Sequence, residues 1–425
     1  MKVLVVGSGG REHALAWKLA ESPRVTALYA WPGNPGIAQV ADCAGSDVMD
    51  FAGIEKFARQ NAIDLVVIGP EDPLAAGLAD RLIAGGLKVF GPTRDAAQLE
   101  ADKWFAKDLM RQQSVPTAEA RSFTDPSAAE EYVRRVGGSV VIKASGLAKG
   151  KGVTIAYRTS DALEAIEQIM RRRAFGEAGG RVVIEELLSG PECSIFALVD
   201  HKSIYVMEAA QDHKPVDEGD TGPMTGGMGA YSPTPMVTEE LMRTIEREIL
   251  VPTIDGLVRD NIKYRGVLFA GLMLTDYGAK VLEFNCRFGD PETQPLMMRL
   301  KSDLAEVLLA VAEGHLDRVN LKWDERPAVS VVAASGGYPG KYVGGKVITG
   351  LDDADAMRDV KVFHGGTKLI DGNVVTDGGR VLSVTALGDT IAAAQKRAYE
   401  AMSKIHFDGI YYRRDIAHRA MRQTA

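Results

Sequence analysis

The segment EFNCRFGDPETQ, residues 283–294, follows the apolar run AKVLEF and places an acid and an amide two residues apart. Alternate residues of a strand point to the same face, so Glu283 and Asn285 direct hard oxygen donors into one small volume. Such a pair suits Mg²⁺ bound to nucleotide phosphates. Arg287 has the same parity, and its planar fork suits a carboxylate or phosphate oxygen beside the ion. Taken alone, the acid and amide fit equally a solvated strand end with an ordinary salt bridge.

The composition narrows the class of protein. A chain of 425 residues suggests roughly two to four domains, and 45 glycines with 46% apolar residues are typical of a globular α/β protein. The net charge of −7 disfavours a nucleic-acid-binding surface, which needs a basic face. Three scattered cysteines, with no signal peptide or apolar span in the pattern, predict a cytoplasmic protein without disulfides or membrane contact.

Three regions differ in their pattern of strands and helices. Residues 1–101 alternate short apolar runs with amphipathic segments, which predicts a Rossmann-like parallel sheet with helices on both faces. Residues 102–326 predict a larger α+β region of mixed or antiparallel sheet. Residues 327–425 predict a small mixed domain. The fold class is therefore α/β combined with α+β.

Glycine turns follow three strand ends of the first region, at Gly7, Gly33 and Gly69, and are expected to share one crevice. The first turn, GSGGREH, opens a helix whose N-terminal amides suit an anion. Glu12 stands where a dinucleotide fingerprint needs its third glycine, so a single phosphate is the better expectation. A glycine turn without a ligand stays an alternative.

Two further segments of the central region point to a nucleotide. SGLAKGKGV, residues 145–153, fails the spacing of a P-loop but follows Lys143 at a strand end, where it could fold over phosphates like a lid. IEELLSGPE, residues 184–192, could offer backbone groups to adenine and a later carboxylate to a ribose. A basic surface hairpin and an acidic edge strand are the simpler alternatives.

These segments occur in the order and spacing of the ATP-grasp superfamily, and the chain resembles one of its families more closely. GSGGREH, PGNPG, GPEDPL, KASGLAKGKGV, QDHK, DTGPMTGGMGAYSP and above all RFGDPETQ are similar to the phosphoribosylamine–glycine ligase family. The resemblance implies an ATP-grasp domain over residues 102–326, with a lid subdomain over about 120–190. It implies ATP-dependent ligation of glycine to 5-phosphoribosylamine through glycyl phosphate, in purine biosynthesis, with Mg²⁺ or Mn²⁺.

The resemblance also implies roles for individual residues. Glu283 and Asn285 should hold the metal ion, and Arg287 and Asp290 should lie at the glycine and acyl phosphate. Contacts to ATP are expected from Lys103, Lys143, Ser145, Gly146, Lys149, Gly150, Gly152, Glu185, Glu186, Leu188 and Glu192. Contacts to the sugar amine are expected from Gly9, Gly10, Asn34, Glu71, Asp212 and His213.

Some features leave other interpretations open. Ser8, Pro215 and Met224 depart from the family pattern, which bears on affinity for the acceptor and not on the class of reaction. The alternatives are another ATP-grasp ligase or carboxylase, a catalytically silent nucleotide-binding regulator, and an NAD-dependent oxidoreductase, the last disfavoured by Glu12. We expect a monomer, with weak dimerisation as the alternative.

Overall fold

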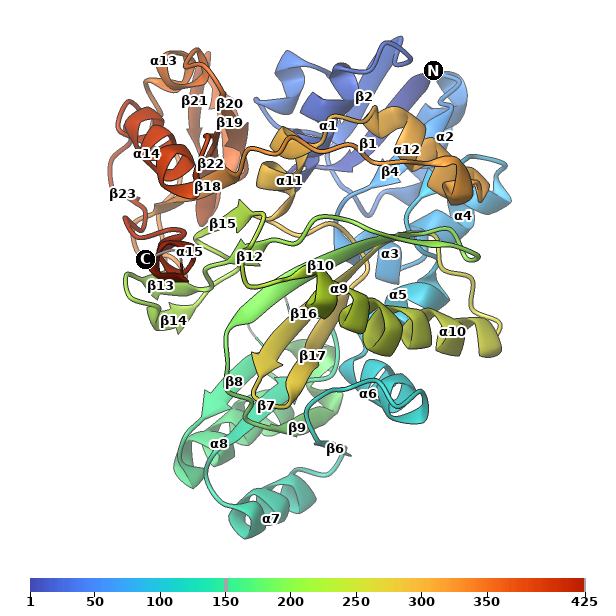
Figure 1. Ribbon diagram of the computed structural model, residues 1–425, viewed down its shortest axis with the longest axis vertical. Coiled ribbons are helices and arrows are strands. Elements are labelled where there is room, and N and C mark those ends of the chain that lie inside the picture. The colour runs from blue at the N-terminus through green and yellow to red at the C-terminus, as the bar shows by residue number, and fades with distance from the viewer. Residues whose placement is uncertain (149–151, 424–425) are drawn as a thin grey trace.

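The structure is a computed structural model that describes residues 1–148 and 152–423. The described residues form four sheets of four or more strands and two two-stranded ribbons (Figure 1). The first sheet and the C-terminal sheet lie at the top of this view, joined by contacts between α1 (Gly10–Ala20) and β19 (Val360–His364). The sheet of residues 120–186 lies at the bottom, with α7 (Pro126–Val136) and α8 (Thr159–Ile166) beside it.

The N-terminal sheet is parallel, in the order β3-β2-β1-β4-β5, as the alternating pattern predicts. Its apolar strands are buried between two layers of helices. The strands are β1 (Lys2–Gly7), β2 (Ala27–Pro32), β3 (Asp42–Cys43), β4 (Leu65–Ile68) and β5 (Val89–Phe90). The helices are α1 (Gly10–Ala20), α2 (Phe51–Gln60), α3 (Glu71–Ala75), α4 (Leu78–Ala84) and α5 (Arg94–Ala101), with a 3₁₀ turn at Ile37–Gln39.

The run LAAGLADRLIAGG, residues 74–86, has a helical pattern, and the structure divides it between the end of α3 and α4. Gly77 lies between them with φ +90°, a left-handed conformation that only glycine adopts readily.

The next sheet is antiparallel, in the order β6-β9-β7-β8, and falls within the segment 120–190 for which a lid is predicted. Its core packs against α7 and α8. The strands are β6 (Ala120–Phe123), β7 (Val140–Ala144), β8 (Val153–Ala156) and β9 (Val182–Glu186). The helices are α6 (Lys103–Gln112), α7 (Pro126–Val136) and α8 (Thr159–Ile166), followed by a π turn at Glu167–Arg171 and a 3₁₀ turn at Gly176–Gly180.

The third sheet, β11-β10-β16-β17, is antiparallel and carries the segment EFN at the end of its last strand. A bulge after Gly271 shifts the register, so that Glu283 pairs with Gly271 and Asn285 with Phe269. The strands are β10 (Glu192–Val199), β11 (Ile204–Val206), β16 (Gly266–Thr275) and β17 (Gly278–Asn285). The helices are α9 (Glu239–Ile245), α10 (Val251–Arg259), α11 (Thr293–Arg299) and α12 (Leu304–Glu313), with a π turn at Glu246–Leu250 and a 3₁₀ turn at Leu316–Arg318.

The C-terminal sheet takes two of its strands from the middle of the chain. Its order is β12-β15-β18-β22-β19, with β23 paired to β18. These strands are β12 (Gln211–Asp212), β15 (Gly229–Ser232), β18 (Ala328–Ser335), β19 (Val360–His364), β22 (Arg380–Leu387) and β23 (Ile410–Tyr411). The ribbons are β13 (Pro215–Asp217) with β14 (Thr221–Met224), and β20 (Thr367–Ile370) with β21 (Asn373–Thr376); the helices are α13 (Leu351–Asp355), α14 (Ile391–Met402) and α15 (His418–Gln423).

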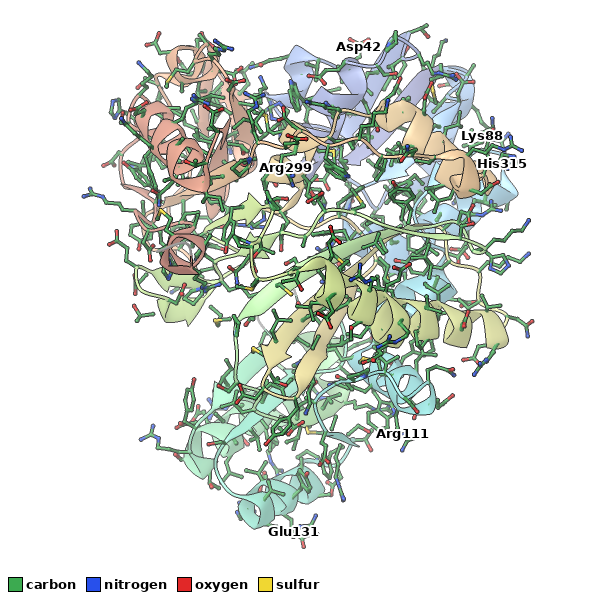
Figure 2. All side chains as sticks on the ribbon, viewed as in Figure 1. Asp42, Lys88, Arg111, Glu131, Arg299 and His315 are labelled. Carbon is green, nitrogen blue, oxygen red and sulfur yellow. The ribbon has the colours of Figure 1, made fainter. Side chains whose placement is uncertain are left out.

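Arg299, labelled near the centre of Figure 2, ties the central and C-terminal parts together. Its side chain is buried and donates to Ser232 Oγ at 2.8 Å and to the carbonyl oxygens of Asp324 and Arg326 at 3.1 Å each. Each of these bonds involves a charged donor, which makes it stronger than a neutral one. The linker before β18 is thereby fixed to α11. Within residues 1–148 and 152–423, no helix is long and apolar enough to cross a membrane.

Candidate active site

The three glycine turns of the N-terminal sheet lie together, as predicted. The Gly33 N–H donates to the Gly7 carbonyl at 3.2 Å, and the Gly69 N–H donates to the Val6 carbonyl at 2.9 Å. The turns therefore meet at the carboxyl ends of β1, β2 and β4, between the central strands of the sheet. This is the edge where open parallel sheets bind ligands.

A buried carboxylate occupies part of this crevice. Glu12 accepts from the Gly9 N–H at 2.7 Å and from Arg11 Nε at 2.6 Å. A Cβ on Gly7 or Gly69 would collide with the Glu12 side chain, so both glycines leave room for it. The space that a dinucleotide fingerprint keeps open for pyrophosphate thus holds an acid of the protein itself, which argues against the oxidoreductase alternative.

The side-chain amide of Asn34 hydrogen-bonds to the protein backbone. Its Nδ2 donates to the carbonyls of Ser8 at 2.8 Å and His364 at 2.9 Å, and its Oδ1 accepts from the N–H groups of Gly36 and Ile37 at 2.9 Å each. These bonds link the first glycine turn to the end of β19 in the C-terminal sheet. Asn34 therefore shapes the crevice, whatever else it contacts.

The segment RFGDPETQ folds directly against the first glycine turn. A Cβ on Gly9 would lie 3.7 Å from Asp290 Oδ2, and one on Gly10 would lie 3.5 Å from Asp290 Oδ1. Arg11 donates from Nη1 to the Phe288 carbonyl at 3.1 Å. Residues that are almost 300 positions apart thus form one wall, and the predicted catalytic and acceptor-binding groups Asp290, Gly9 and Gly10 are brought together.

Arg287 is held between two acids. Its Nε lies 3.3 Å from Glu71 Oε2, and its Nη2 lies 3.0 Å from Glu100 Oε1. Burial would raise the pKa of Glu71, but Arg287 and Arg11 hold it at about 2. Burial raises the pKa of Glu100 to about 7 despite Arg287, and this acid also accepts from the Cys286 N–H at 2.7 Å. Sequence reasoning missed Glu100, which no motif marks.

The predicted nucleotide groups converge between the second and third sheets. Lys143, on β7, lies 3.0 Å from Glu185 Oε2 on β9 and donates to the Leu282 carbonyl of β17 at 3.0 Å. Lys107 Nζ reaches the same Glu185 oxygen at 3.1 Å. The other oxygen, Glu185 Oε1, is buried without a hydrogen-bond partner among the described residues. Such a group is costly unless a ligand satisfies it.

Lys107 is a second residue that sequence reasoning missed, although a signal existed. It follows Lys103 by four positions on α6, so the two ammonium groups share one face of the helix. Burial lowers the pKa of Lys107 to about 8, while Glu185 acts to raise it. Burial also lowers the pKa of Lys103, against Glu283, which acts to raise it.

The glycine loop begins beside these lysines. Ser145 Oγ donates to Asp102 Oδ1 at 2.6 Å, and the Gly146 carbonyl accepts from Lys103 Nζ at 3.4 Å. A Cβ on Gly152 would collide with Ala148, so the two sides of the loop approach closely there. Of the predicted loop contacts, Lys149 and Gly150 lie outside the described residues.

Glu283 and Asn285 are open to a cation. Both lie on β17, and within residues 1–148 and 152–423 neither side chain has a hydrogen bond or ion pair of its own. A carboxylate and an amide oxygen at alternate positions form a donor set that a hard divalent cation prefers. The residues present therefore fit a Mg²⁺ or Mn²⁺ ion, and a lysine face borders them on α6.

Glu192 and Asp212 share a lysine that sequence reasoning missed. Lys214 Nζ lies 2.8 Å from Glu192 Oε2 and 3.2 Å from Asp212 Oδ1. Burial would lower the pKa of Lys214, but Asp212 and Glu192 raise it well above its ordinary value. Glu186 is more exposed and pairs with Lys280 at 2.9 Å, and Leu188 lies half-buried in the connection to β10. All three acids predicted to contact the nucleotide, Glu185, Glu186 and Glu192, thus have lysine partners.

His213 turns away from this cluster toward the C-terminal segment. Its Nε2 accepts from the Ala417 N–H at 2.9 Å, which leaves the proton of the neutral ring on Nδ1, 3.5 Å from Asp220. Asp220 and His418 complete a group with metal-like spacing. Arg413 and Arg419 both bind Asp220, and a protonated Nδ1 cannot ligate, so this group is a structural clasp between β12 and the C-terminus.

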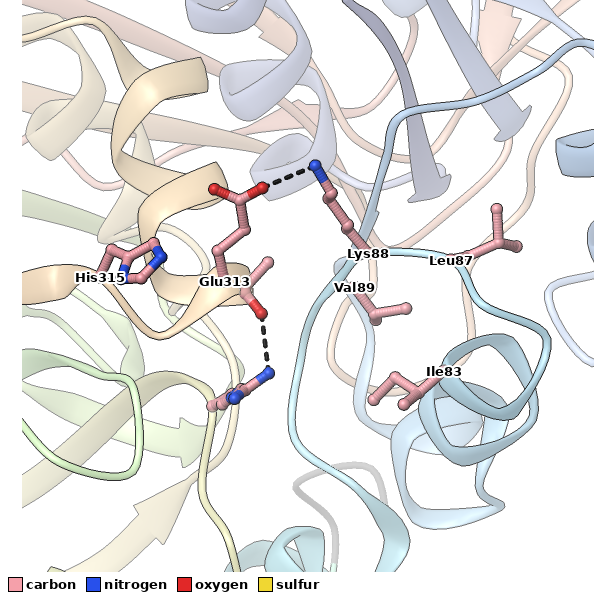
Figure 3. A pocket seen from close by; sticks show the side chains of 8 residues that line it. Ile83, Leu87, Lys88, Val89, Glu313 and His315 are labelled. Atoms are coloured by element: carbon pink, nitrogen blue, oxygen red, sulfur yellow. Dashed lines mark hydrogen bonds and ion pairs between the residues drawn. The ribbon is translucent and has the colours of Figure 1, made fainter.

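A separate hollow lies away from this site, where α12 meets β5 (Figure 3). It encloses about 420 Å³. Its charges are already used: Lys88 Nζ lies 2.6 Å from Glu313, and Arg265 Nη1 donates to the Ala312 carbonyl at 2.9 Å. The hollow therefore presents little unpaired polar chemistry. Its lining is Ile83, Leu87, Lys88, Val89, Arg265, Ala312, Glu313 and His315.

Comparison with known proteins agrees with this geometry. Models described as the N domain, the ATP-grasp (A) domain and the C domain of phosphoribosylglycinamide synthetase match residues 1–100, 101–293 and 328–419. Phosphoribosylamine–glycine ligases of Escherichia coli O6:H1 and Rhodopirellula baltica are 52% and 50% identical, each over 99% of this chain and over 99% and 98% of their own.

Solved structures agree with this result, one at the level of the family and one at the level of the fold. A crystal structure of phosphoribosylamine–glycine ligase from Thermotoga maritima has a TM-score of 0.85 at 31% identity, covering 98% of this chain and all of its own. The biotin carboxylase domain of Hydrogenobacter thermophilus 2-oxoglutarate carboxylase has a TM-score of 0.75 at 15% identity, over 97% and 91%, and shows the fold alone. The chain belongs to the phosphoribosylamine–glycine ligase family of ATP-grasp enzymes.

Proposed function

We propose that this chain ligates glycine to 5-phosphoribosylamine at the expense of ATP, giving glycinamide ribonucleotide, ADP and phosphate, in purine biosynthesis. The main support for this proposal is that one segment runs from the nucleotide end of the site to the acceptor end. Residues 283–294 begin with the open acid and amide of β17 and end against the glycine turn of the N-terminal sheet. A nucleotide end and an acceptor end are therefore joined by a few residues.

The nucleotide is bound between the second and third sheets. Lys103 and Lys143 bind its phosphates, and the loop at Ser145, Gly146 and Gly152 covers them together with Lys149 and Gly150. The unpartnered Glu185 Oε1 accepts from the adenine amino group, beside Glu186 and the Leu188 backbone. Glu192 accepts from the ribose hydroxyls, with Lys214 holding its carboxylate in place.

Glu283 and Asn285 would hold a divalent cation, Mg²⁺ or Mn²⁺. When bound, the ion would neutralise phosphate charge during transfer. The lysines of α6 and β7 add positive charge on the same side. This charge helps the anionic glycine carboxylate to approach an anionic phosphate.

The chemistry has two steps. A glycine carboxylate oxygen attacks the γ-phosphorus and ADP leaves, which forms glycyl phosphate. The amine of phosphoribosylamine then attacks the carbonyl carbon, phosphate leaves, and the nitrogen loses a proton as the amide forms. The protein positions charges for both steps and keeps water from the acyl phosphate.

Arg287 and Asp290 serve the glycine. Arg287 presents a guanidinium that Glu71 and Glu100 already orient, which suits the carboxylate or the acyl phosphate. Asp290 supplies a negative charge for the glycine ammonium group. Gly9, Gly10, Asn34 and Glu71 shape the acceptor pocket, with Asp212 and His213 fixing the far side through the C-terminal clasp.

An ADP-release assay with purified chain tests the proposal. ATP, glycine and freshly made phosphoribosylamine should release ADP only when all are present, and product should appear in equal amount. Bicarbonate in place of glycine tests the carboxylase alternative, and equal release with bicarbonate would contradict the proposal. Sedimentation and cell fractionation test the expected monomeric state and cytoplasmic location.

A further inference from the structure

Arg380, the first residue of β22, connects the C-terminal sheet to the segment RFGDPETQ. Its Nη1 donates to the Asp290 carbonyl at 2.6 Å and to the Gly226 carbonyl at 2.8 Å, with a longer contact to the Gly227 carbonyl at 3.4 Å. Its Nη2 lies 3.5 Å from Asp290 Oδ2. One guanidinium thus holds two loops that are more than sixty residues apart in the chain.

The two loops are shaped to accept this side chain. Gly227 has φ +116°, and a Cβ there would collide with Pro291. A Cβ on Gly226 would lie 3.0 Å from Arg380 Cζ. Tyr338 Oη, from the same C-terminal sheet region, accepts from the Gly226 N–H at 3.2 Å. The segment 224–228 is therefore pinned between Arg380, Tyr338 and the 287–292 loop.

The orientation of Asp290 follows from these contacts. Gln294 Nε2 donates to its Oδ1 at 2.9 Å, while Arg380 attracts its Oδ2 and fixes its backbone carbonyl. The carboxylate is held against Gly9 and Gly10 in this orientation. A lysine could supply the charge, but it lacks the second nitrogen that lies beside Asp290 Oδ2 while Nη1 donates to the carbonyls of both loops.

We propose that Arg380 is a positioning residue for the glycine and acceptor half of the site, acting through Asp290 and assisted by Tyr338. This inference rests on the proposed function, because Asp290 matters only if glycine binds beside it. The C-terminal domain then governs affinity for glycine and phosphoribosylamine, while ATP binds between the other two sheets without its help. Arg380 itself holds the loops in place, because its Nη1 already donates to backbone carbonyls.

Steady-state kinetics of R380A, R380K and Y338F test the inference. R380A should raise the KM for glycine and for phosphoribosylamine about tenfold or more, because small displacements of a reacting group are costly. R380K should recover only part of this loss, and Y338F should show a smaller change in the same direction. Calorimetric binding of a non-hydrolysable ATP analogue should be the same in all variants.

The matched control is R326K. Arg326 also forks between two acids, Asp324 and Asp359, but precedes β18 at the end that pairs with Leu387, opposite to Arg380. R326K should keep the KM for glycine of the wild type, even where its thermal midpoint falls.

Two outcomes would overturn the inference. One is R380A and R380K with unchanged KM for glycine and phosphoribosylamine. The other is an equal loss of affinity for the ATP analogue, which would indicate a general structural role. If R380A does not fold, R380K and Y338F decide alone. A wild-type chain without glycine-dependent ADP release would instead refute the proposed function, and this inference with it.

Discussion

The glycine-turn crevice and the nucleotide end of β17 contain the same residue types in opposite states. In the crevice, Asn34 makes four hydrogen bonds to backbone groups, and Glu12 accepts from a backbone amide and an arginine. On β17, Asn285 and Glu283 have no such bonds to the described residues. The amide and the acid of the first region build the fold, whereas those of the second are left for a ligand.

The difference shows how to separate structural from functional polar residues. A satisfied buried group costs stability when it is removed, because its partners lose their bonds. An open group costs activity and leaves stability nearly unchanged. Each region therefore predicts a different experimental signature for the same substitution.

The largest effect is expected for E283Q. The glutamine keeps the shape but removes the charge that binds the cation, so kcat should fall by about 10²–10³, as when other charge-stabilising groups at active sites are removed. ADP release at saturating ATP and Mg²⁺ measures the loss. The thermal midpoint should stay within error of the wild type.

E306Q is the control for this change. Glu306 forms an exposed ion pair with Arg24 of the N-terminal region, and its loss should leave turnover intact. An E283Q variant with normal kcat would remove the cation role of β17. A large fall in its thermal midpoint would place Glu283 with the structural acids.

N34A and N285A form a matched pair for the comparison. N34A should lower the free energy of unfolding by about 2–4 kcal/mol, because it strands two buried N–H groups and two carbonyls. N285A should unfold like the wild type but lose turnover. Urea unfolding followed by circular dichroism, together with ADP release, measures both. If N34A proves stable and inactive, Asn34 belongs with the ligand-binding groups.

The thermal stability of E100Q across a range of pH tests Glu100, which contacts Arg287 and Cys286 between the two regions. A raised pKa means that folded Glu100 holds a proton that the unfolded chain has lost, so its contribution to stability falls as pH rises from 4.5 to 7. Between pH 5.5 and 7 this amounts to at most about 2 kcal/mol. E100Q should flatten the decline of the thermal midpoint in that range.

Glu71 is the built-in contrast for that series. Its pKa of about 2 lies below its ordinary value, so its stabilisation is complete above pH 4.5 and is lost only as pH falls toward 2. E71Q should therefore shift the midpoint by a constant amount between pH 5.5 and 7. A wild-type midpoint that rises across this range would contradict the state assigned to Glu100.

Much of the fold could be predicted because its signals are local. The apolar runs of β1, β4 and β7, and the helical pattern of α6, are each readable within a few residues. The split of α3 from α4 was not predicted, because a single glycine within a helical pattern is often tolerated. The membership of β12 in the C-terminal sheet was not predictable either, since a two-residue strand has no period.

The candidate site also contains residues with local sequence signals and residues without them. Glu283, Asn285 and Lys143 stand in motifs, and the structure brings them to one region. Glu100 and Arg380 were missed because their partners are distant in the chain: Glu100 lies 186 positions from Cys286, and Arg380 lies 90 positions from Asp290. When only tertiary packing brings two residues together, their spacing in the sequence gives no signal of the contact.

The smallest effect is expected for E186Q, beside the buried Glu185. Glu186 has 41% of its side chain exposed and pairs with Lys280 at 2.9 Å, and such surface pairs contribute roughly 0–1 kcal/mol. E186Q should therefore change the KM for ATP and the thermal midpoint only slightly, whereas E185Q should weaken the preference for ATP over GTP. Kinetics with both nucleotides, at low and high salt, measure this. A large rise in the KM for ATP in E186Q alone would show that the exposed acid, and not the buried one, reads the adenine.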